Sequence, residues 1–187
     1  PLDLTAAFAG FGNGGFRATP HAVLRVRADR GGLLYDRARD EPAPKRVLRS
    51  WVVGDMNAML ARVVQAGTGR RAAIAGQMVG GKTGTTSAYR DAWFVGFSSH
   101  LVGGIWLGND DYKSTRQVTG GQLPATIWQA VMAPAHRDLP GTPLPGTDGS
   151  PPLDGEPGGL IAEVRPAGGR GGFREVRGAP TGFVVAR

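Results

Sequence analysis

The chain of 187 residues contains no cysteine, and this absence excludes several classes of protein. Without a thiol there is no disulfide framework, no cysteine nucleophile and no cysteine-ligated metal ion. Histidine is almost as scarce, because only His21, His100 and His136 are present, far apart and without the spacing of metal ligands. The sequence therefore predicts no metal site, although the lack of cysteine does not fix the compartment.

Long apolar runs are also missing from the chain. No stretch approaches the roughly 18 uninterrupted apolar residues of a membrane-spanning helix, and the opening residues PLDLTAAF contain neither a basic leader nor a signal-type cleavage site. With 41% hydrophobic residues, the chain is long enough to form one globular domain. Because it begins directly within an apolar helical pattern, we expect a segment of a longer polypeptide whose targeting signal and membrane anchor lie upstream.

Lysine is rare, and the net charge of +7 at pH 7 comes mostly from arginine. The lysines are Lys45, Lys82 and Lys113. A basic chain can bind nucleic acid, but these arginines are scattered singly and are not interleaved with aromatic residues, which make up only 7% of the chain. The pattern therefore does not favour a nucleic-acid partner.

The first part of the chain combines helices with a hairpin. Residues 2–10 are an apolar helix that ends at the glycine cluster GFGNGG. Two short β-prone runs within 21–36 flank the turn sequence DRGG and predict a hairpin apart from the main sheet. Apolar residues within 51–64 recur at three- and four-residue steps, which predicts an amphipathic helix capped by Ser50.

From residue 78 to 108 the pattern changes to three short β-prone stretches separated by turn-forming residues, which predicts consecutive antiparallel strands. A further helix is predicted at 122–135. The glycine- and proline-rich run from 139 to 187 has too little apolar surface to fold. The sequence thus predicts an α+β domain over residues 1–138, with an antiparallel sheet flanked by helices, and a flexible tail over 139–187.

The run GQMVGGKTGTT, which begins at Gly76, fits two incompatible motifs. It matches the phosphate-loop pattern G-x-x-x-x-G-K-[ST], while Lys82-Thr83-Gly84 matches the third motif of the penicillin-interactive serine enzymes. A phosphate loop requires a helix that starts at the lysine, so that its N-terminal amide groups face the phosphates. Here the lysine is followed by β-branched threonines around a glycine, which disfavour a helical first turn. A nucleotide-binding protein is therefore a remote alternative.

An extended strand suits the same run better. In a strand, alternation places Lys82 and Gly84 on one side of the backbone and Thr83 and Thr85 on the other. The missing side chain at Gly84 lets a substrate approach the backbone closely. The sequence therefore predicts that the lysine lies within a β-strand.

The longer run GGKTGTTSAYRDAWFVGFSSHLVGGIWLGNDD resembles the transpeptidase domain of class A, bifunctional penicillin-binding proteins. In that family Lys-Thr-Gly-Thr-Thr is followed by a turn and by Asp-Ala-Trp-Phe-x-Gly on the next strand. The segments PLDLTAAFAGFGNGGFRATPH, MLARVVQAGTGRRAAIAGQMVGGKTGTT and TGGQLPATIWQAVM resemble the family in order and spacing. The resemblance covers residues 1–135 and implies the C-terminal part of the penicillin-binding-protein and β-lactamase fold.

The resemblance implies part of a peptidoglycan D,D-transpeptidase that needs no cofactor, cross-links stem peptides by serine acyl transfer and binds β-lactams. Lys82 would supply positive charge beside the nucleophile, and the N–H of Thr85 would be one oxyanion-hole donor. The hydroxyls of Thr83 and Thr85 would bind the terminal carboxylate of the substrate beside Gly84, with Thr86 a weaker candidate for the same pocket. Such a domain would act at the extracytoplasmic (periplasmic) face of the cell membrane.

Two of the three active-site motifs of that family are missing from this sequence. No serine is followed by lysine three residues later or by asparagine two residues later. In the family both motifs precede the segment that PLDLTAAF resembles, so we expect them upstream in a longer protein and expect this chain alone to be inactive. Loss of the helices that carry them would expose the sheet near Val95 and Phe97, which predicts poor solubility. A non-catalytic module of the same fold, which binds cell-wall peptide or a divisome partner, stays open as an alternative.

Overall fold

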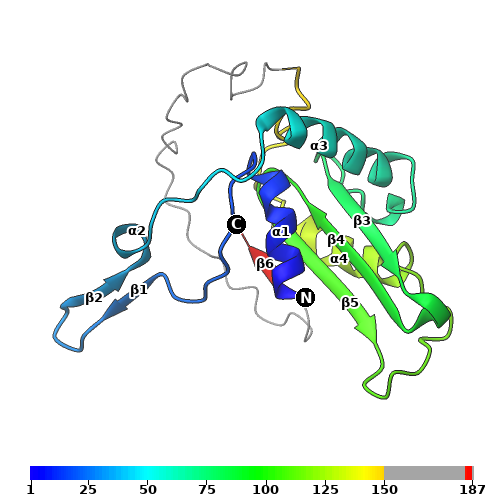
Figure 1. Cartoon of the computed structure of the whole chain (residues 1–187), viewed down its shortest axis with the longest axis horizontal. Helices are drawn as coiled ribbons and strands as arrows, with labels where there is room; N and C mark the ends of the chain where they lie inside the picture. The colour runs from blue at the N-terminus through cyan, green and yellow to red at the C-terminus, as the bar shows by residue number, and fades with distance from the viewer. Residues whose placement is uncertain (150–183, 187) are drawn as a thin grey trace.

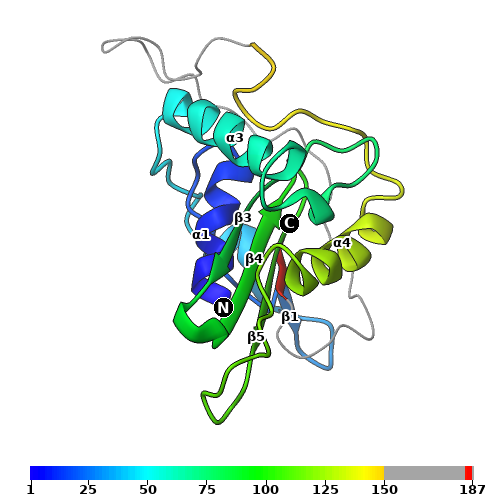
Figure 2. The ribbon, with the colours of Figure 1, turned by 90° about the vertical axis from the view of Figure 1, so that its right-hand side faces the viewer.

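The computed structural model describes residues 1–149 and 184–186. The body of the molecule is a four-stranded antiparallel sheet packed against helices (Figure 1). The sheet separates α1 (Leu2–Gly12) from α4 (Leu123–Ala135), so the body has three layers (Figure 2). This is the α+β arrangement that the sequence predicts. None of the helices in the described part of the chain is long and apolar enough to cross a membrane.

The sheet has the strand order β3–β4–β5–β6, and every neighbouring pair is antiparallel. The first three strands follow one another in the chain, as predicted, and the strand that contains Lys82 lies beside the strand that begins at Asp91. A short 3-10 helix, η2, forms the turn between them. The bounds of these elements are β3 (Gly80–Thr85), η2 (Ser87–Tyr89), β4 (Asp91–Phe97), β5 (Val102–Gly108) and β6 (Val184–Ala186).

A row of glycines crosses three neighbouring strands on the face toward α4. Gly81, Gly96 and Gly103 are register partners. A Cβ atom on Gly96 would lie 2.7 Å from the Phe94 ring and 2.9 Å from the Trp128 indole, closer than real contacts allow. The indole Nε1–H of Trp128 donates to the Gly103 carbonyl at 3.0 Å. The glycine row therefore lets two buried aromatic rings lie directly on the sheet backbone.

Each face of the sheet carries its own hydrophobic cluster. The cluster on the α4 side contains Val64, Ala72, Ile74, Val79, Phe94, Ile105, Ala125, Trp128 and Met132. The cluster on the α1 side contains Leu60, Ala61, Phe97, Val102 and Leu144. Phe97 is fully buried and Val95 is 3% exposed, because α1 and the segment around Leu144 cover this face. The expectation that these two residues would be exposed is wrong, and the prediction of poor solubility loses that basis.

Helix α3 (Ser50–Gln65) crosses one end of the sheet, near the start of β3 (Figures 1 and 2). The predicted helix is present, and its buried positions are Val53, Gly54, Asn57, Leu60, Ala61 and Val64. Two of the apolar residues whose spacing predicted it, Trp51 and Met59, are exposed, so the buried face differs from the predicted one. Arg49 occupies the N-cap position without a side-chain hydrogen bond, so Ser50 begins the helix and does not cap it. The loop 67–69 and the 3-10 helix η1 (Arg70–Ala72) follow and lead back toward the sheet.

A hairpin arm, residues 25–40, projects away from the body (Figure 1). It comprises β1 (Arg25–Arg27), β2 (Leu33–Asp36) and one turn of helix, α2 (Arg37–Asp40). The two strands form a sheet of their own, which confirms the prediction of a hairpin apart from the main sheet. The sequence analysis did not predict α2.

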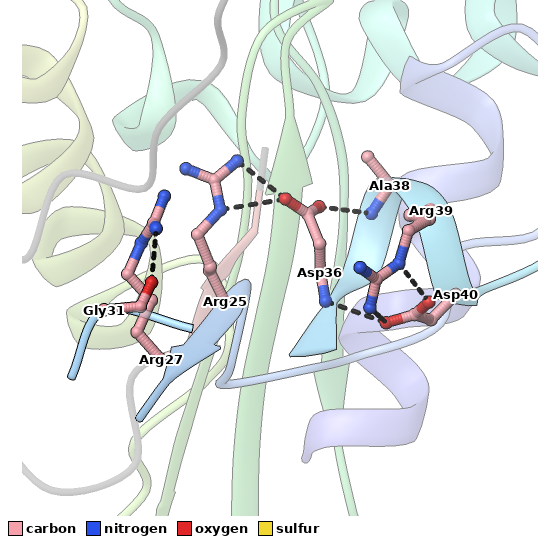
Figure 3. A network of polar contacts seen from close by, with 7 residues as sticks. All are labelled: Arg25, Arg27, Gly31, Asp36, Ala38, Arg39 and Asp40. Carbon is pink, nitrogen blue, oxygen red and sulfur yellow. Dashed lines mark hydrogen bonds and ion pairs between the residues drawn. The ribbon is translucent and has the colours of Figure 1, made fainter. Parts of the chain in front are cut away.

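Exposed charged side chains connect the strands of the hairpin arm to α2 (Figure 3). The Asp36 carboxylate accepts from Arg25 Nε at 2.8 Å and from the Ala38 N–H at 3.1 Å, so one side chain pairs the strands and caps the helix. The guanidinium of Arg25 holds the pKa of Asp36 below its ordinary value. The guanidinium of Arg39 likewise lowers the pKa of Asp40 to about 2. The arm thus carries its ion pairs at the surface and buries few of its apolar side chains.

Part of the predicted tail packs on the body. Leu144 is fully buried, Asn57 Nδ2 donates to the Pro145 carbonyl at 2.9 Å, and Ser99 Oγ donates to the Pro143 carbonyl at 2.5 Å. The packed body therefore continues beyond residue 138, because one leucine and the carbonyls of a proline-rich run find partners on α3 and the β4–β5 turn. Residues 184–186 of the same predicted tail form β6, and residues 150–183 and 187 lie outside the described residues.

A buried hydroxyl and imidazole connect α4 to the β4–β5 turn. Ser98 Oγ accepts from the N–H groups of His100 and Leu101 at 3.0 and 3.1 Å, and lies 2.7 Å from His136 Nε2. Because both acceptor positions of the hydroxyl are used, its proton must point to Nε2. His136 Nδ1 then donates to the Met132 carbonyl at 2.7 Å, so the imidazole is neutral. Burial lowers the pKa of His136, which agrees with this protonation state.

Candidate active site

β3 forms one edge of the sheet, so one side of its backbone has no strand partner among the described residues. At its end, the Thr86 N–H donates to the Asp91 carbonyl at 3.0 Å. Hydrogen-bonded pairs alternate along an antiparallel ladder, so the N–H and C=O groups of Gly81, Thr83 and Thr85 point away from β4. An extended peptide can add to such an edge by main-chain hydrogen bonds.

Lys82 lies in the middle of β3, paired in register with Val95. No helix begins at this lysine, so the phosphate-loop interpretation is wrong. The side chain is exposed, and its Nζ donates to the Thr83 carbonyl at 2.8 Å. The ammonium group is therefore held at the open edge of the strand, on the face of the sheet that α1 covers further along.

Thr83 and Thr85 lie on the opposite face from Lys82, as strand alternation requires. Thr83 Oγ1 is 2.8 Å from Thr68 Oγ1, in the loop after α3. Thr85 Oγ1 accepts from the Gly120 N–H at 3.1 Å, in the loop before α4. Two loops from distant parts of the chain therefore meet over β3 and hold both hydroxyls next to the open edge.

Close backbone contact fixes the second of these loops above the strand. A Cβ atom on Gly120 would lie 2.6 Å from the Gly84 carbonyl oxygen and 2.8 Å from the Gly84 nitrogen. A Cβ atom on Gly121 would collide with the Thr68 carbonyl. Only glycine fits at both loop positions, and Gly84 itself is paired with Trp93 in the ladder.

Thr86 does not join the two threonines of the strand. Its hydroxyl accepts from the Asp91 N–H at 2.8 Å and donates to Asp91 Oδ2 at 3.2 Å. The same carboxylate accepts from Trp106 Nε1 at 3.0 Å. Thr86, Asp91 and Trp106 therefore close the β3–β4 turn. The Thr86 hydroxyl is used in that turn and does not join the hydroxyls of Thr83 and Thr85.

The sequence analysis missed Thr68, Gly120 and Gly121. Their only sequence signals are the short turns GTG after α3 and TGG before α4, which resemble ordinary helix ends. Nothing local indicates that both turns reach the same strand, because the contacts span 15 and 35 residues of sequence. These residues could be found only by knowing the fold.

The arrangement can bind an extended peptide that ends in a carboxylate. The open edge supplies main-chain donors and acceptors, the two hydroxyls can bond carboxylate oxygens, and Lys82 contributes a positive charge. A nucleophile is not among these groups. The only closely paired serine and histidine described above, Ser98 and His136, are each 3% exposed and have their hydrogen bonds satisfied, so they are structural.

Comparison with known proteins assigns the chain to a family. The family described as the penicillin binding protein transpeptidase domain matches residues 1–128. Penicillin-binding protein 1A of Aquifex aeolicus is 38% identical over 143 residues, which cover 75% of this chain and 19% of that protein. Penicillin-binding protein 4 of Bacillus subtilis is 31% identical over 136 residues, 73% of this chain and 21% of that protein. The chain thus spans about a fifth of the length of these relatives.

Solved structures agree with the sequence relatives. The PonA1 protein of Mycobacterium tuberculosis in complex with penicillin V has a TM-score of 0.69 at 25% identity, over 77% of this chain and 40% of that one. Penicillin-binding protein 1A of Haemophilus influenzae has a TM-score of 0.67 at 26% identity, over 77% of this chain and 27% of that one. The fold, the strand position of Lys82 and the family match together show that this chain belongs to the penicillin-binding protein transpeptidase domain family.

Proposed function

We propose that this chain is part of a class A peptidoglycan D,D-transpeptidase and supplies the strand on which the acyl-donor stem peptide binds. The observation that carries the proposal is the open edge of β3, where Lys82 and the hydroxyls of Thr83 and Thr85 lie together. A non-catalytic module that only binds a peptide would use the main-chain groups of the open edge, but it would not require the positive charge of Lys82. The extracytoplasmic face of the cell membrane, where peptidoglycan is cross-linked, is the proposed location.

The proposed reaction proceeds through an acyl-enzyme. A serine oxygen attacks the carbonyl carbon of the penultimate D-alanine, the amide C–N bond breaks, and the departing D-alanine amine takes up a proton. The amine of a neighbouring stem peptide then attacks the ester carbonyl, the ester C–O bond breaks, and the proton that the amine loses goes to the serine oxygen, which leaves the cross-link and the free serine. The serine belongs to the Ser-x-x-Lys motif, which is not in this sequence, so a longer protein must supply it.

The residues of β3 have separate roles in this proposal. Lys82 stabilises negative charge and assists proton transfer near the serine. The outward N–H of Thr85 is one donor to the oxyanion. The hydroxyls of Thr83 and Thr85 bind the terminal carboxylate of the donor peptide, or the carboxylate of a β-lactam, while Gly84 leaves room for the peptide backbone. The Thr86 hydroxyl serves the turn.

The first test is to read the gene upstream of Pro1 for Ser-x-x-Lys followed by Ser-x-Asn. The second is to express that longer protein and measure covalent labelling by a fluorescent penicillin. We expect Lys82→Ala to lower the acylation rate by about 100-fold or more without unfolding the protein, because a transition-state charge and a proton-transfer group are lost.

The matched control is Lys113→Ala, because Lys113 is exposed and pairs with Asp111 outside the site. This variant should be labelled like the wild type. Equal acylation of the Lys82→Ala protein would refute the assigned role of the lysine. Saturable labelling of residues 1–187 alone would mean that a serine within this chain is the nucleophile, against the proposal.

A further inference from the structure

The loop between α3 and η1 places a third threonine hydroxyl beside the proposed carboxylate site. Thr68 Oγ1 lies 2.8 Å from Thr83 Oγ1, and both side chains are accessible to solvent. Thr68 comes 15 residues before Thr83 in the chain, so this pair is a product of the fold. Holding two surface threonines at this distance costs conformational entropy, because each side chain loses rotamer freedom.

The backbone on both sides of Thr68 is held by separate contacts. The N–H groups of Gly67 and Gly69 donate to the Val63 carbonyl at 3.1 and 2.9 Å, which fixes the loop to the last turn of α3. On its other side the Thr68 carbonyl is in contact with Gly121, where no side chain would fit. Thr68 therefore does not depend on its own hydroxyl for its position.

The donors and acceptors of the two hydroxyls show which hydrogen bonds the pair can still form. Each threonine hydroxyl has one proton and two acceptor positions. One of the two protons joins Thr68 to Thr83, and the other has no partner among the described residues. Thr85 Oγ1 accepts from the Gly120 N–H and so also keeps its proton. Two unused O–H donors therefore lie on the same face beside the open edge, which matches the two oxygens of one carboxylate.

We propose that Thr68 is a positioning residue for carboxylate recognition. Its O–H donates to Thr83 Oγ1, which leaves the Thr83 proton directed at one carboxylate oxygen while Thr85 donates to the other. A charged acceptor strengthens such a chain, since each hydroxyl is polarised by the next. This inference rests on the proposed function and adds to it a residue from outside the Lys-Thr-Gly strand.

The test compares two probes in the longer protein that contains this chain. Benzylpenicillin carries the carboxylate, and its methyl ester does not. We expect Thr68→Val to lower the acylation rate constant for benzylpenicillin by roughly tenfold, about the contribution of one hydrogen bond, because the Thr83 proton is no longer held toward the carboxylate. The rate with the methyl ester should be unchanged. Thr68→Ser, which keeps the hydroxyl, should restore most of the rate with benzylpenicillin.

The matched control is Thr126→Val, because the Thr126 hydroxyl donates to the carbonyl of Gln122, the N-cap residue of α4, and lies outside the site. It should not change the rate with either probe. Equal rate losses for the two probes in Thr68→Val would show a general structural role, and no loss with benzylpenicillin would show no role at all; either result overturns the inference but not the proposed function. A wild-type protein that benzylpenicillin does not acylate would overturn both.

Discussion

The hairpin arm and the four-stranded sheet are both antiparallel, but they are stabilised by different interactions. In the sheet, Phe94 and Phe97 are fully buried and the aromatic rings lie on backbone glycines. In the arm, Leu34 is 65% exposed and the strands are connected by Arg25 and Asp36 at the surface. A two-stranded hairpin is marginal alone, whereas burial on two faces stabilises a sheet strongly. Similar backbone hydrogen bonding therefore coexists with very different sensitivity to substitution.

The largest effect should come from removing a ring from the sheet interior. Phe94→Ala deletes a fully buried side chain that packs edge-on to Trp128, with ring centroids 5.5 Å apart. We expect the free energy of unfolding to fall by about 3–5 kcal/mol, since a cavity replaces the ring. Urea denaturation followed by tryptophan fluorescence measures this change.

The matching substitution in the hairpin arm is Leu34→Ala. Because this leucine is mostly exposed, the free energy of unfolding should change by only about 0.5 kcal/mol or less. If the two alanine variants lost similar stability, the contrast between a buried sheet and a surface arm would be wrong.

An intermediate effect is expected at the Ser98 and His136 pair. Ser98→Ala leaves the buried imidazole and two backbone N–H groups without their partner, so it should cost about 1–3 kcal/mol at neutral pH. The pair should also make stability depend on pH. Since the folded pKa of His136 lies below its ordinary value of 6.5, the unfolded chain takes up the proton first as the pH falls. The stabilisation is complete above about pH 6.5 and is lost progressively below it.

The pH dependence can be assigned by substitution. Unfolding free energies measured from pH 5 to 8 should lose this acid-side slope in His136→Gln. His21→Gln, near the hairpin arm, serves as the control and should keep the slope. An unchanged slope in His136→Gln would mean that the imidazole is not the group responsible.

The smallest effect is expected for the ion pair of the hairpin arm. Asp36→Asn removes the charge opposite Arg25 but keeps a side chain that can cap α2. Exposed ion pairs contribute little and are screened by salt. The free energy of unfolding should therefore change less than in Phe94→Ala, Ser98→Ala or Leu34→Ala. The difference from wild type should shrink further as NaCl is added. A large, salt-independent loss would show that the arm supports the body.

Local patterns were enough to predict most elements of the body. The three- and four-residue spacing of Met56, Leu60 and Val63 predicted α3, and the threonines around Gly84 predicted a strand at Lys82. The first signal is a helical period, and the second is the preference of β-branched side chains for extended backbone. The same local signals could not show that Ser50 starts the helix and does not cap it.

The rest depends on contacts between residues far apart in the chain. Leu144 is a single leucine in a proline- and glycine-rich run, so nothing in its neighbourhood indicates a buried position, yet it completes the cluster around Phe97. Thr68 reaches Thr83 only because α3 ends beside β3. Lys82, Thr83 and Thr85 could be named as candidate site residues from a motif, whereas the loops that contact the two threonines could not be found that way.

The glycine row connects the interior of the sheet to the loop that contacts the Thr85 hydroxyl. A methyl group at Gly96 would push against the Trp128 indole, and Trp128 lies on the helix that begins just after Gly120 and Gly121. Displacement of that helix would move the loop that holds the Thr85 hydroxyl. A substitution at an interior glycine of the sheet would therefore reach the Thr85 hydroxyl through Trp128 and the loop before α4, although it changes no residue of the site itself.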